Sequence, residues 1–166
     1  MFSLWVAGTP RPAGSKRAFR NRGPGRKFII ADDCKAGPAW KAMVKLLARE
    51  YWAGKPAIAG PVLLILDFKV SRPKRHFGTG ANAGRIKTVF VKAWPTVKPD
   101  TTKFVRAVED ALTGVAWNDD AQVVRQIAQK RYAGPGEQAG VTILVFPATV
   151  SILHRVDPTF TVESRA

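Results

Sequence analysis

The sequence predicts a single α+β domain in which a mixed β-sheet is packed by two main helices. The chain has 166 residues and is 46% hydrophobic, which suits one domain with a buried core. Apolar segments typical of strands occur near the start of the chain, in its middle and after residue 120. Two further segments carry apolar residues at helical spacing.

The first third of the chain is expected to contain two strands and a helix. Phe2 to Ala7 alternates apolar and polar residues, which predicts a strand. Gly and Pro residues favour a loop from Gly8 to Arg17, and Phe28 to Ile30 can form a short strand. Pro38 to Trp52 repeats apolar residues at i, i+4, i+7 and i+11, which predicts the first helix.

The middle of the chain combines a buried strand, a long basic segment and the second helix. Val62 to Val70 is apolar enough for a central strand. Ser71 to Pro99 has little pattern, apart from a short strand expected within Lys87 to Lys92. A loop this long inside a domain is usually functional or mobile. A helix is expected from Asp100 to Thr113, with Asp100, Thr101 or Thr102 at its N-terminal cap and Gly114 after its end.

Two final strands are expected at Val123 to Tyr132 and Val141 to Phe146. A Gly- and Pro-containing turn joins them. We therefore expect the domain to occupy residues 1–146, with residues 147–166 as a C-terminal extension.

The charge of the chain favours acidic partners. It has 27 Lys and Arg against 12 Asp and Glu, a net charge of +15 and a pI of about 10.7. Such a balance favours nucleic acid or an anionic membrane. No apolar segment reaches the ~18 residues of a membrane-spanning helix. The single cysteine, Cys34, excludes an intramolecular disulfide and a cysteine zinc site. We expect a cytoplasmic protein that does not associate with membranes.

Long segments rich in Lys and Arg contain no acid, which predicts sequence-independent contacts with DNA phosphates. We assign these contacts to Lys16, Arg17, Arg20, Arg72, Lys74, Arg75 and Lys103. His76, in the second basic segment, is expected to be an exposed bystander, with a phosphate contact as the alternative. The pattern does not decide whether Trp94 is buried.

Five of the twelve acids lie in one window, namely Asp100, Glu109, Asp110, Asp119 and Asp120. A small acidic island on a basic surface suggests a metal-dependent nuclease. The helix from Asp100 would be roughly 20 Å long, and an extended Gly114–Asp120 segment would run about as far back. The sequence therefore predicts that Asp120 returns close to Asp100 and shares Mg²⁺ with it, with Mn²⁺ as an alternative ion.

Each of these acids also suits an ordinary structural role, and spacing alone leaves both interpretations open. Asp100 is a typical helix N-cap, and Asp119–Asp120 is a typical turn pair. Glu109 and Asp110 are typical exposed helix acids. Asp110 would lie about 15 Å from Asp100 on the same helix, so we favour a structural or dimer-contact role for it.

One motif covers Lys98 to Val124. It reads Pro99-Asp100-x5-Arg106-Ala107-x2-Asp110-Ala111-Leu112-Thr113-Gly114, followed by Trp117-x-Asp119-Asp120-x-Gln122-Val123-Val124. This motif resembles the RusA-type Holliday junction resolvases, or crossover junction endodeoxyribonucleases. The resemblance extends more loosely to Pro10–Arg17 and Arg72–His76. It implies a small, dimeric, Mg²⁺-dependent endonuclease of DNA recombination and repair, of a kind often encoded by phages and prophages.

The resemblance also implies roles for individual acids. The first family aspartate falls on Asp100 and the last on Asp120, with Asp119 beside it, so these residues would bind the metal. The second family aspartate falls on Thr102. A threonine hydroxyl can ligate Mg²⁺ but brings no charge. Either another carboxylate completes the site, or activity is weakened, or the protein binds DNA without cutting it.

Two further motif positions carry cations. The family's catalytic lysine falls on Arg106, and the usual asparagine after the second aspartate falls on Lys103. Arg106 keeps the positive charge and suits a phosphate, but it cannot act as a proton donor or acceptor. A phosphate-binding role therefore survives this change better than a proton-transfer role.

The leading hypothesis is a homodimeric, Mg²⁺-dependent endonuclease that resolves four-way DNA junctions by symmetric phosphodiester hydrolysis, without a small-molecule cofactor. Asp100, Asp120 and Arg106 would be its catalytic residues. The alternative is a non-catalytic branched-DNA-binding protein with a degraded metal site, motivated by Thr102. A basic RNA-binding accessory protein is the third hypothesis, although no RNA-binding aromatic motif supports it.

Overall fold

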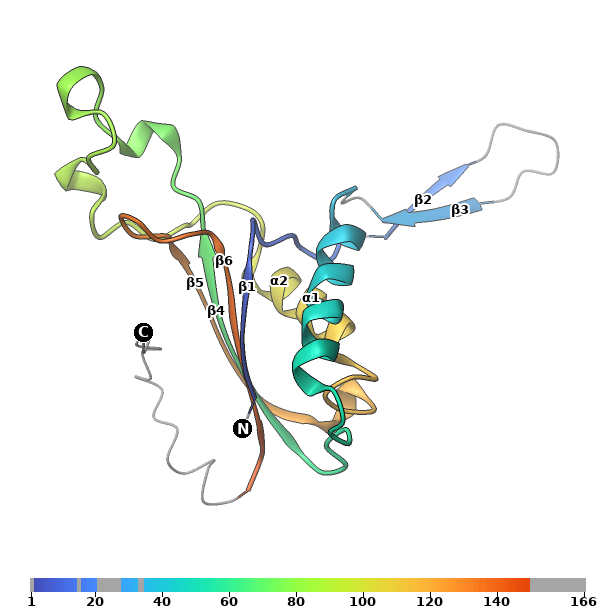
Figure 1. Cartoon of the computed structure of the whole chain (residues 1–166). Coiled ribbons are helices and arrows are strands. Elements are labelled where there is room, and N and C mark those ends of the chain that lie inside the picture. The colour runs from blue at the N-terminus through green and yellow to red at the C-terminus, as the bar shows by residue number, and fades with distance from the viewer. Residues whose placement is uncertain (1, 15, 21–27, 33–34, 150–166) are drawn as a thin grey trace.

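The main sheet contains four strands in the order β1-β6-β4-β5, and two helices cover one of its faces (Figure 1). The structure, a computed structural model, describes residues 2–14, 16–20, 28–32 and 35–149, without the side chains of 16–20 and 28–32. The strands are β1 (Phe2–Ala7), β4 (Val62–Val70), β5 (Val123–Tyr132) and β6 (Gly140–Pro147), and the helices are α1 (Gly37–Trp52) and α2 (Thr101–Leu112). This confirms the predicted α+β class with a mixed sheet and two main helices.

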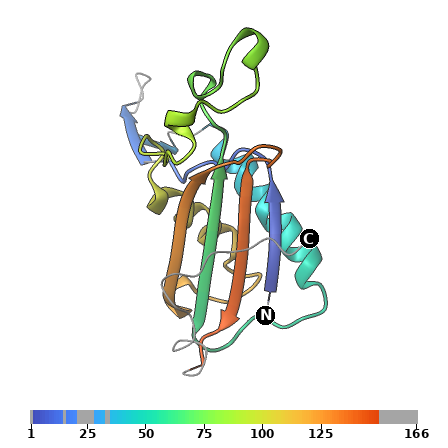
Figure 2. The same cartoon turned by 90° about the vertical axis from the view of Figure 1, so that its left-hand side faces the viewer.

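A separate hairpin stands apart from the main sheet. β2 (Lys16–Arg20) and β3 (Phe28–Asp32) pair antiparallel with each other only. The hairpin projects beside the helices, while the segment after β4 projects from the end of the sheet (Figures 1 and 2). Among the described residues, no helix is long and apolar enough to cross a bilayer.

The strands β4 and β5 are parallel, and this pairing determines the path of the chain between them. Their register runs from Val62↔Val123 to Val70↔Tyr132. Parallel neighbours need a long crossover connection, and here residues 71–122 provide it. Because the chain must return to the beginning of β4 before it enters β5, α2 runs antiparallel to both strands. Its N-terminus therefore lies at the carboxyl end of β4.

The core lies between the sheet and the two helices. β4 is buried on both faces over Val62–Phe68, as a central strand should be. Phe68 stacks on Phe104 of α2, with ring centroids 5.2 Å apart. Trp40 and Val44 of α1 are buried in the same cluster. Burying each large side chain of this kind contributes about 1.5–3 kcal/mol.

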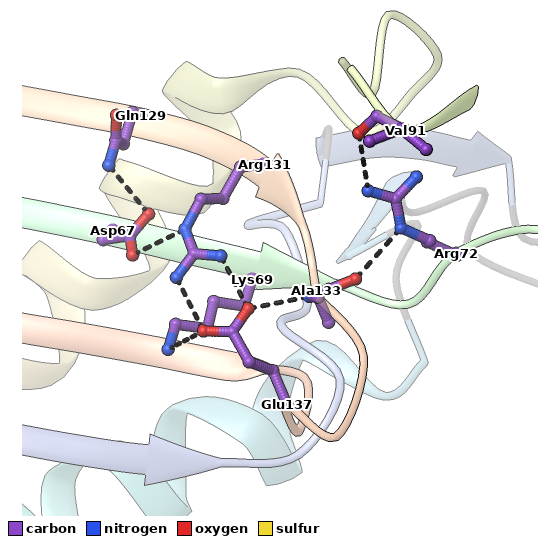
Figure 3. Close-up of polar contacts among 9 residues, drawn as sticks. Asp67, Lys69, Arg72, Val91, Gln129, Arg131, Ala133 and Glu137 are labelled. Atoms are coloured by element: carbon purple, nitrogen blue, oxygen red, sulfur yellow. Dashed lines mark hydrogen bonds and ion pairs between the residues drawn. The ribbon is translucent and has the colours of Figure 1, made fainter. Parts of the chain in front are cut away.

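The sheet face opposite the helices carries a network of charges at the carboxyl end of β4 (Figure 3). Asp67 is only 1% exposed and accepts hydrogen bonds from Gln129 Nε2 and Arg131 Nε, both at 3.1 Å. Arg131 also binds Glu137 with both Nη atoms, at 2.7 and 3.1 Å, and Lys69 Nζ lies 2.8 Å from Glu137. These partners satisfy a buried carboxylate that would otherwise be costly to enclose.

Some sequence expectations are wrong in detail. The strand expected within Lys87–Lys92 is instead a 3₁₀ helix, η3 (Thr88–Phe90). The loop expected to extend to Arg17 ends earlier, because β2 begins at Lys16. Asp100 is the N-cap of α2, but its side chain makes no capping hydrogen bond.

The last strand, β6, ends at Pro147, one residue beyond the expected end of the domain at residue 146. Ala148 follows and is still buried, packed with Leu63 and Ile65, and its N–H donates to Pro61 O at 2.7 Å. Residues 150–166 lie outside the described part, so a separate C-terminal extension stays a prediction.

We predict that Glu137→Gln destabilises the fold. Hydrogen bonds from Arg131, then from Lys69 and the Gly134 N–H, hold the pKa of Glu137 far below its usual 4.5, against the effect of burial. Losing the charge should lower the free energy of unfolding at pH 7 by about 1–3 kcal/mol, measured by urea denaturation. Since the folded pKa is depressed, this stabilisation is present above pH 4.5 and is lost as the pH falls further. The exposed Glu50→Gln variant is the control, and equal stabilities for both variants would contradict the prediction.

Candidate functional site

The acids of the motif lie at the two ends of α2, not together. At the N-terminal end, the Asp100 side chain is 54% exposed, and its Oδ2 lies 4.0 Å from Lys103 Nζ. The backbone beside it is held by Lys130 of β5, whose Nζ donates to Pro99 O at 2.8 Å and to Val97 O at 2.9 Å. Asp100 therefore presents a carboxylate at the carboxyl end of β4, in basic surroundings.

Asp120 lies at the other end of α2. Its Oδ1 accepts hydrogen bonds from Thr113 Oγ1 and, at 3.4 Å, from Trp117 Nε1. Thr113 is the C-cap of α2, and the indole of Trp117 is fully buried. These two donors orient the exposed Asp120 carboxylate immediately before β5.

Asp119 has a structural role in this turn. Its Oδ1 accepts a hydrogen bond from Ala121 N at 2.8 Å, and Gln122 Oε1 accepts one from Asp119 N at 3.0 Å, which makes a capping box on η4 (Asp120–Gln122). Gln122 Nε2 also donates to Ile58 O at 2.7 Å and to Gly60 O at 2.9 Å. This set of bonds fixes the conformation of the turn that carries Asp120.

The predicted return of Asp120 to Asp100 does not occur within the chain. The segment after α2 is a compact turn, in which Gly114 N donates to Trp117 O at 2.7 Å. Gly114 has a φ of 73°, which glycine adopts at no steric cost. Burial of Trp117 then keeps the chain at the end of the helix. The twelve residues of α2 separate the two carboxylates by about 18 Å, too far for a shared ion.

The described residues of the chain do not by themselves fit a metal ion. They contain no group of three or more His, Cys, Asp or Glu side chains that could hold one. Structural and catalytic Mg²⁺ sites use carboxylate oxygens together with waters, so each end of α2 offers only part of a site. Thr102 and Arg106 both lie exposed on α2, one turn apart, between the two ends.

Glu109 is half-buried rather than the exposed helix acid that the sequence predicted. Its carboxylate accepts a hydrogen bond from Gln126 Nε2 of β5. Burial raises the pKa of Glu109, and the neighbouring Asp120 and then Asp110 raise it further. Glu109 stands four residues before Thr113 on the same helix face, so its proximity to Asp120 follows once Asp120 is known to bind Thr113.

Asp110 has an intramolecular partner. Its Oδ2 lies 3.0 Å from Lys41 Nζ of α1. An ion pair this exposed contributes about 1 kcal/mol or less, but it joins the two helices and gives Asp110 a structural role. We therefore do not group Asp110 with Asp100 at one end of α2 or with Asp120 at the other.

Residues 71–99, which we call the arm, project from the end of the sheet beyond β4 (Figures 1 and 2). The arm contains η1 (Lys74–His76), η2 (Gly80–Asn82) and η3, and a bridge between Phe77 and Ile86 closes it on itself. Its exposed cations are Lys74, Arg75, Arg85, Lys87, Lys92 and Lys98. The arm is thus a folded basic projection.

Arg72 joins the arm to the sheet, and its expected contact with DNA stays a prediction. Its Nε donates to Ala133 O at 3.1 Å and its Nη1 to Phe90 O at 2.8 Å (Figure 3 shows the first of these). Its guanidinium also lies 5.2 Å from the ring centroid of Tyr132. Because its donors are engaged within the protein, we assign Arg72 a structural role.

His76 is not exposed, contrary to expectation. It is 3% exposed, stacks on Phe90 at 4.1 Å between centroids and meets the ring of Tyr132 edge-on at 5.1 Å. Burial lowers the pKa of His76, and the nearby Arg75 lowers it further. A neutral imidazole is therefore the centre of a small aromatic core inside the arm.

The remaining basic residues assigned to DNA belong to two places. Lys74 and Arg75 are exposed on the arm, and Lys103 lies beside Asp100. Lys16, Arg17 and Arg20 belong to β2, and their side chains lie outside the described part of the structure. Their contacts with DNA stay a prediction.

The chain matches known proteins over most of its length. Residues 7–144 match the family described as "RusA: Endodeoxyribonuclease RusA". The chain is also similar to "Uncharacterized protein YqaN" of Bacillus subtilis (strain 168), at 30% identity over 140 residues, which are 84% of this chain and 92% of that protein.

We predict that Arg72→Met loosens the arm. Without the guanidinium, three backbone carbonyls lose a donor and the ring of Tyr132 loses the cation that packs against it. Trypsin should then cleave within residues 71–99 at least several-fold faster, because local unfolding exposes its basic sites. The control is Lys74→Met, which removes one cation from the same exposed segment. Equal cleavage rates in the two variants would show that Arg72 does not anchor the arm.

Proposed function

The chain belongs to the RusA family of endodeoxyribonucleases, and on this premise we propose that it is a homodimeric, Mg²⁺-dependent enzyme that resolves Holliday junctions by symmetric phosphodiester hydrolysis. The observation that carries the proposal is the position of Asp100 and Asp120. Both motif carboxylates are exposed, and they stand at opposite ends of one helix in a protein of net charge +15. A polyanion is the expected partner of such a surface.

A two-fold dimer would complete a site that one protomer leaves incomplete. When two copies of α2 pack antiparallel about a two-fold axis, the N-terminus of each helix lies beside the C-terminus of the other. Asp100 of one protomer would then face the partner's Asp120. The same operation makes two identical sites, one for each strand to be cut. This arrangement replaces the single-chain site that the sequence predicted.

The chain's own residues would bind and orient the phosphate. Asp100 and Asp120 supply carboxylate oxygens of the type Mg²⁺ prefers, and the ion, when bound, polarises the phosphate and lowers the pKa of an attacking water. Arg106, exposed midway along α2, offers a planar pair of donors for a phosphate oxygen. The exposed cations of the arm would hold the DNA backbone by contacts that weaken with salt.

The first test is cleavage of a labelled four-way junction beside a matched linear duplex. We expect paired nicks at the junction with Mg²⁺ and none with EDTA. Asp100→Asn and Asp120→Asn should each lower the rate by on the order of 100-fold. Asp110→Asn, which removes another exposed acid of the motif that is bound to Lys41, should cut at close to the wild-type rate. Wild-type cleavage by Asp120→Asn would refute the assignment.

Mixed dimers test whether the site spans two protomers. A dimer with one Asp100→Asn chain and one Asp120→Asn chain contains one intact pair if the carboxylates come from different protomers. We expect coexpressed mixed dimers to recover cleavage of one strand, giving nicked junctions without complete resolution. No recovery from correctly assembled mixed dimers would show that the two carboxylates act from the same chain or act separately.

Thr102 favours a second candidate, a branched-DNA-binding protein that does not cut. A threonine occupies a position where the family motif has a carboxylate, and one protomer lacks a three-ligand group within its described residues. This function predicts tight junction binding with no Mg²⁺-dependent nicks. Thr102→Asp should then create cleavage, and the uncharged Thr102→Asn should not. A folded Thr102→Asp variant that still fails to cut would count against it.

A further inference from the structure

The arm and the end of the sheet border open surface cavities that the proposed chemistry does not use. Two adjoining cavities, of about 380 and 640 Å³, lie there. Their common walls are formed by Arg72, Val91, Arg131 and Tyr132. Lys92 and Trp94 line the smaller cavity, and Arg85 lines the larger one. These volumes are typical of sites for small organic ligands, which span roughly 300–1,000 Å³.

The walls of the cavity are held in place by the protein. Arg72 is bonded to the backbone of both the arm and the β5–β6 turn, and it covers the ring of Tyr132. Arg131 is bonded to Asp67 and Glu137 (Figure 3). Arg72 therefore forms a fixed positive wall, whereas the charge of Arg131 is balanced by its two carboxylate partners. Lys92 and Arg85 are exposed, and their charges are available to an anion that enters.

Trp94 is held at the cavity with its indole uncovered. The side chain is 62% exposed, although the next residue, Pro95, is buried and Lys130 binds the nearby Val97 O at 2.9 Å. Four of the nine large hydrophobic side chains exposed among the described residues lie between positions 89 and 97. A cluster of exposed apolar groups among cations marks a binding surface.

The chemistry of this surface favours a ligand that is both anionic and flat. No Asp or Glu lines either cavity, and the arm has seven Lys and Arg without a single acid. A nucleotide joins a phosphate to a planar base, which stacks well on an indole. Bases within a duplex are covered by their neighbours, so only an unpaired nucleotide can present its face to Trp94.

We propose that this cavity binds an unpaired nucleotide of branched DNA, with its base against Trp94 and its phosphate at Lys92 and Arg85. The choice of DNA as the ligand rests on the proposed function. The cavity lies at the same end of the sheet as Asp100, since the arm reaches α2 through Val97 and Pro99, which Lys130 holds. DNA held in the cavity thus approaches the N-terminal end of α2.

The test uses a duplex with one unpaired 2-aminopurine and the same duplex with that base paired. Wild type should bind the bulged duplex about 5- to 150-fold more tightly, the range that one stacked base provides. Stacking on Trp94 should also quench the 2-aminopurine fluorescence. Free dAMP and a short single strand serve as competitors, which distinguishes a free nucleotide from one within a DNA strand. An acidic peptide of glutamates is the third competitor.

Two pairs of variants locate the contact. Trp94→Ala should abolish the preference and the quenching while binding to the paired duplex changes less than about 2-fold. Val89→Ala, which alters another exposed apolar side chain of the arm that lines neither cavity, should change neither. Lys92→Gln should reduce the preference for the bulged duplex. Lys74→Gln should weaken binding to both duplexes equally, because Lys74 lines neither cavity.

Equal affinity of wild type for the two duplexes would overturn the inference, as would a preference that survives Trp94→Ala. Displacement of the bulged probe by the acidic peptide but not by dAMP or the single strand would also overturn it and assign the cavity to a protein ligand. Junction cleavage reports separately on the proposed function. A protein that cuts paired junctions without preferring the bulge refutes the inference alone, and one that prefers the bulge through Trp94 but never cuts refutes the nuclease alone.

Discussion

The parallel pairing of β4 with β5 is the constraint on which the rest of the structure depends. Two parallel neighbours cannot be joined by a tight turn, so the chain must travel from the end of β4 back to the beginning of β5. Helix α2 makes this return and packs Phe104 against Phe68 of the sheet. The arm occupies the beginning of the crossover and the acidic turn occupies its end. The residues of the motif therefore lie along this crossover, with Asp100 at one end of the sheet and Asp120 at the other.

The two ends are stabilised by different physical means. At the carboxyl end of β4, charges are satisfied by other charges, since Asp67, Arg131 and Glu137 form one connected network. This network and the hydrogen bonds of Arg72 attach the arm to the sheet mainly through polar contacts. At the opposite end, burial of Trp117 and a capping box hold the turn that orients Asp120. A rigid turn keeps the carboxylate in one position, as ligation would require.

Much of the candidate site could be predicted from the sequence, but its assembly could not. The motif identified Asp100, Asp120 and Arg106 as candidates because their spacing matches a family pattern. Their relation in space depended on whether Gly114–Asp120 was extended or folded, and local composition allows both. The compact turn forms because Trp117 finds a buried place beside Ile58, a residue far away in the chain. The location of Glu109 beside Asp120 depended on the same long-range packing.

By itself, the sequence determined the features that arise from local periodicity and composition. These are the α+β class, the positions of both helices and the main strands, the basic character and the family. The tertiary structure alone decided which charged groups are free and which are used internally. Arg72, His76 and Asp110 read as surface residues in the sequence, yet each is bound within the protein. The reason is physical: burial and pairing of a polar side chain depend on neighbours from distant segments, which only the fold brings together.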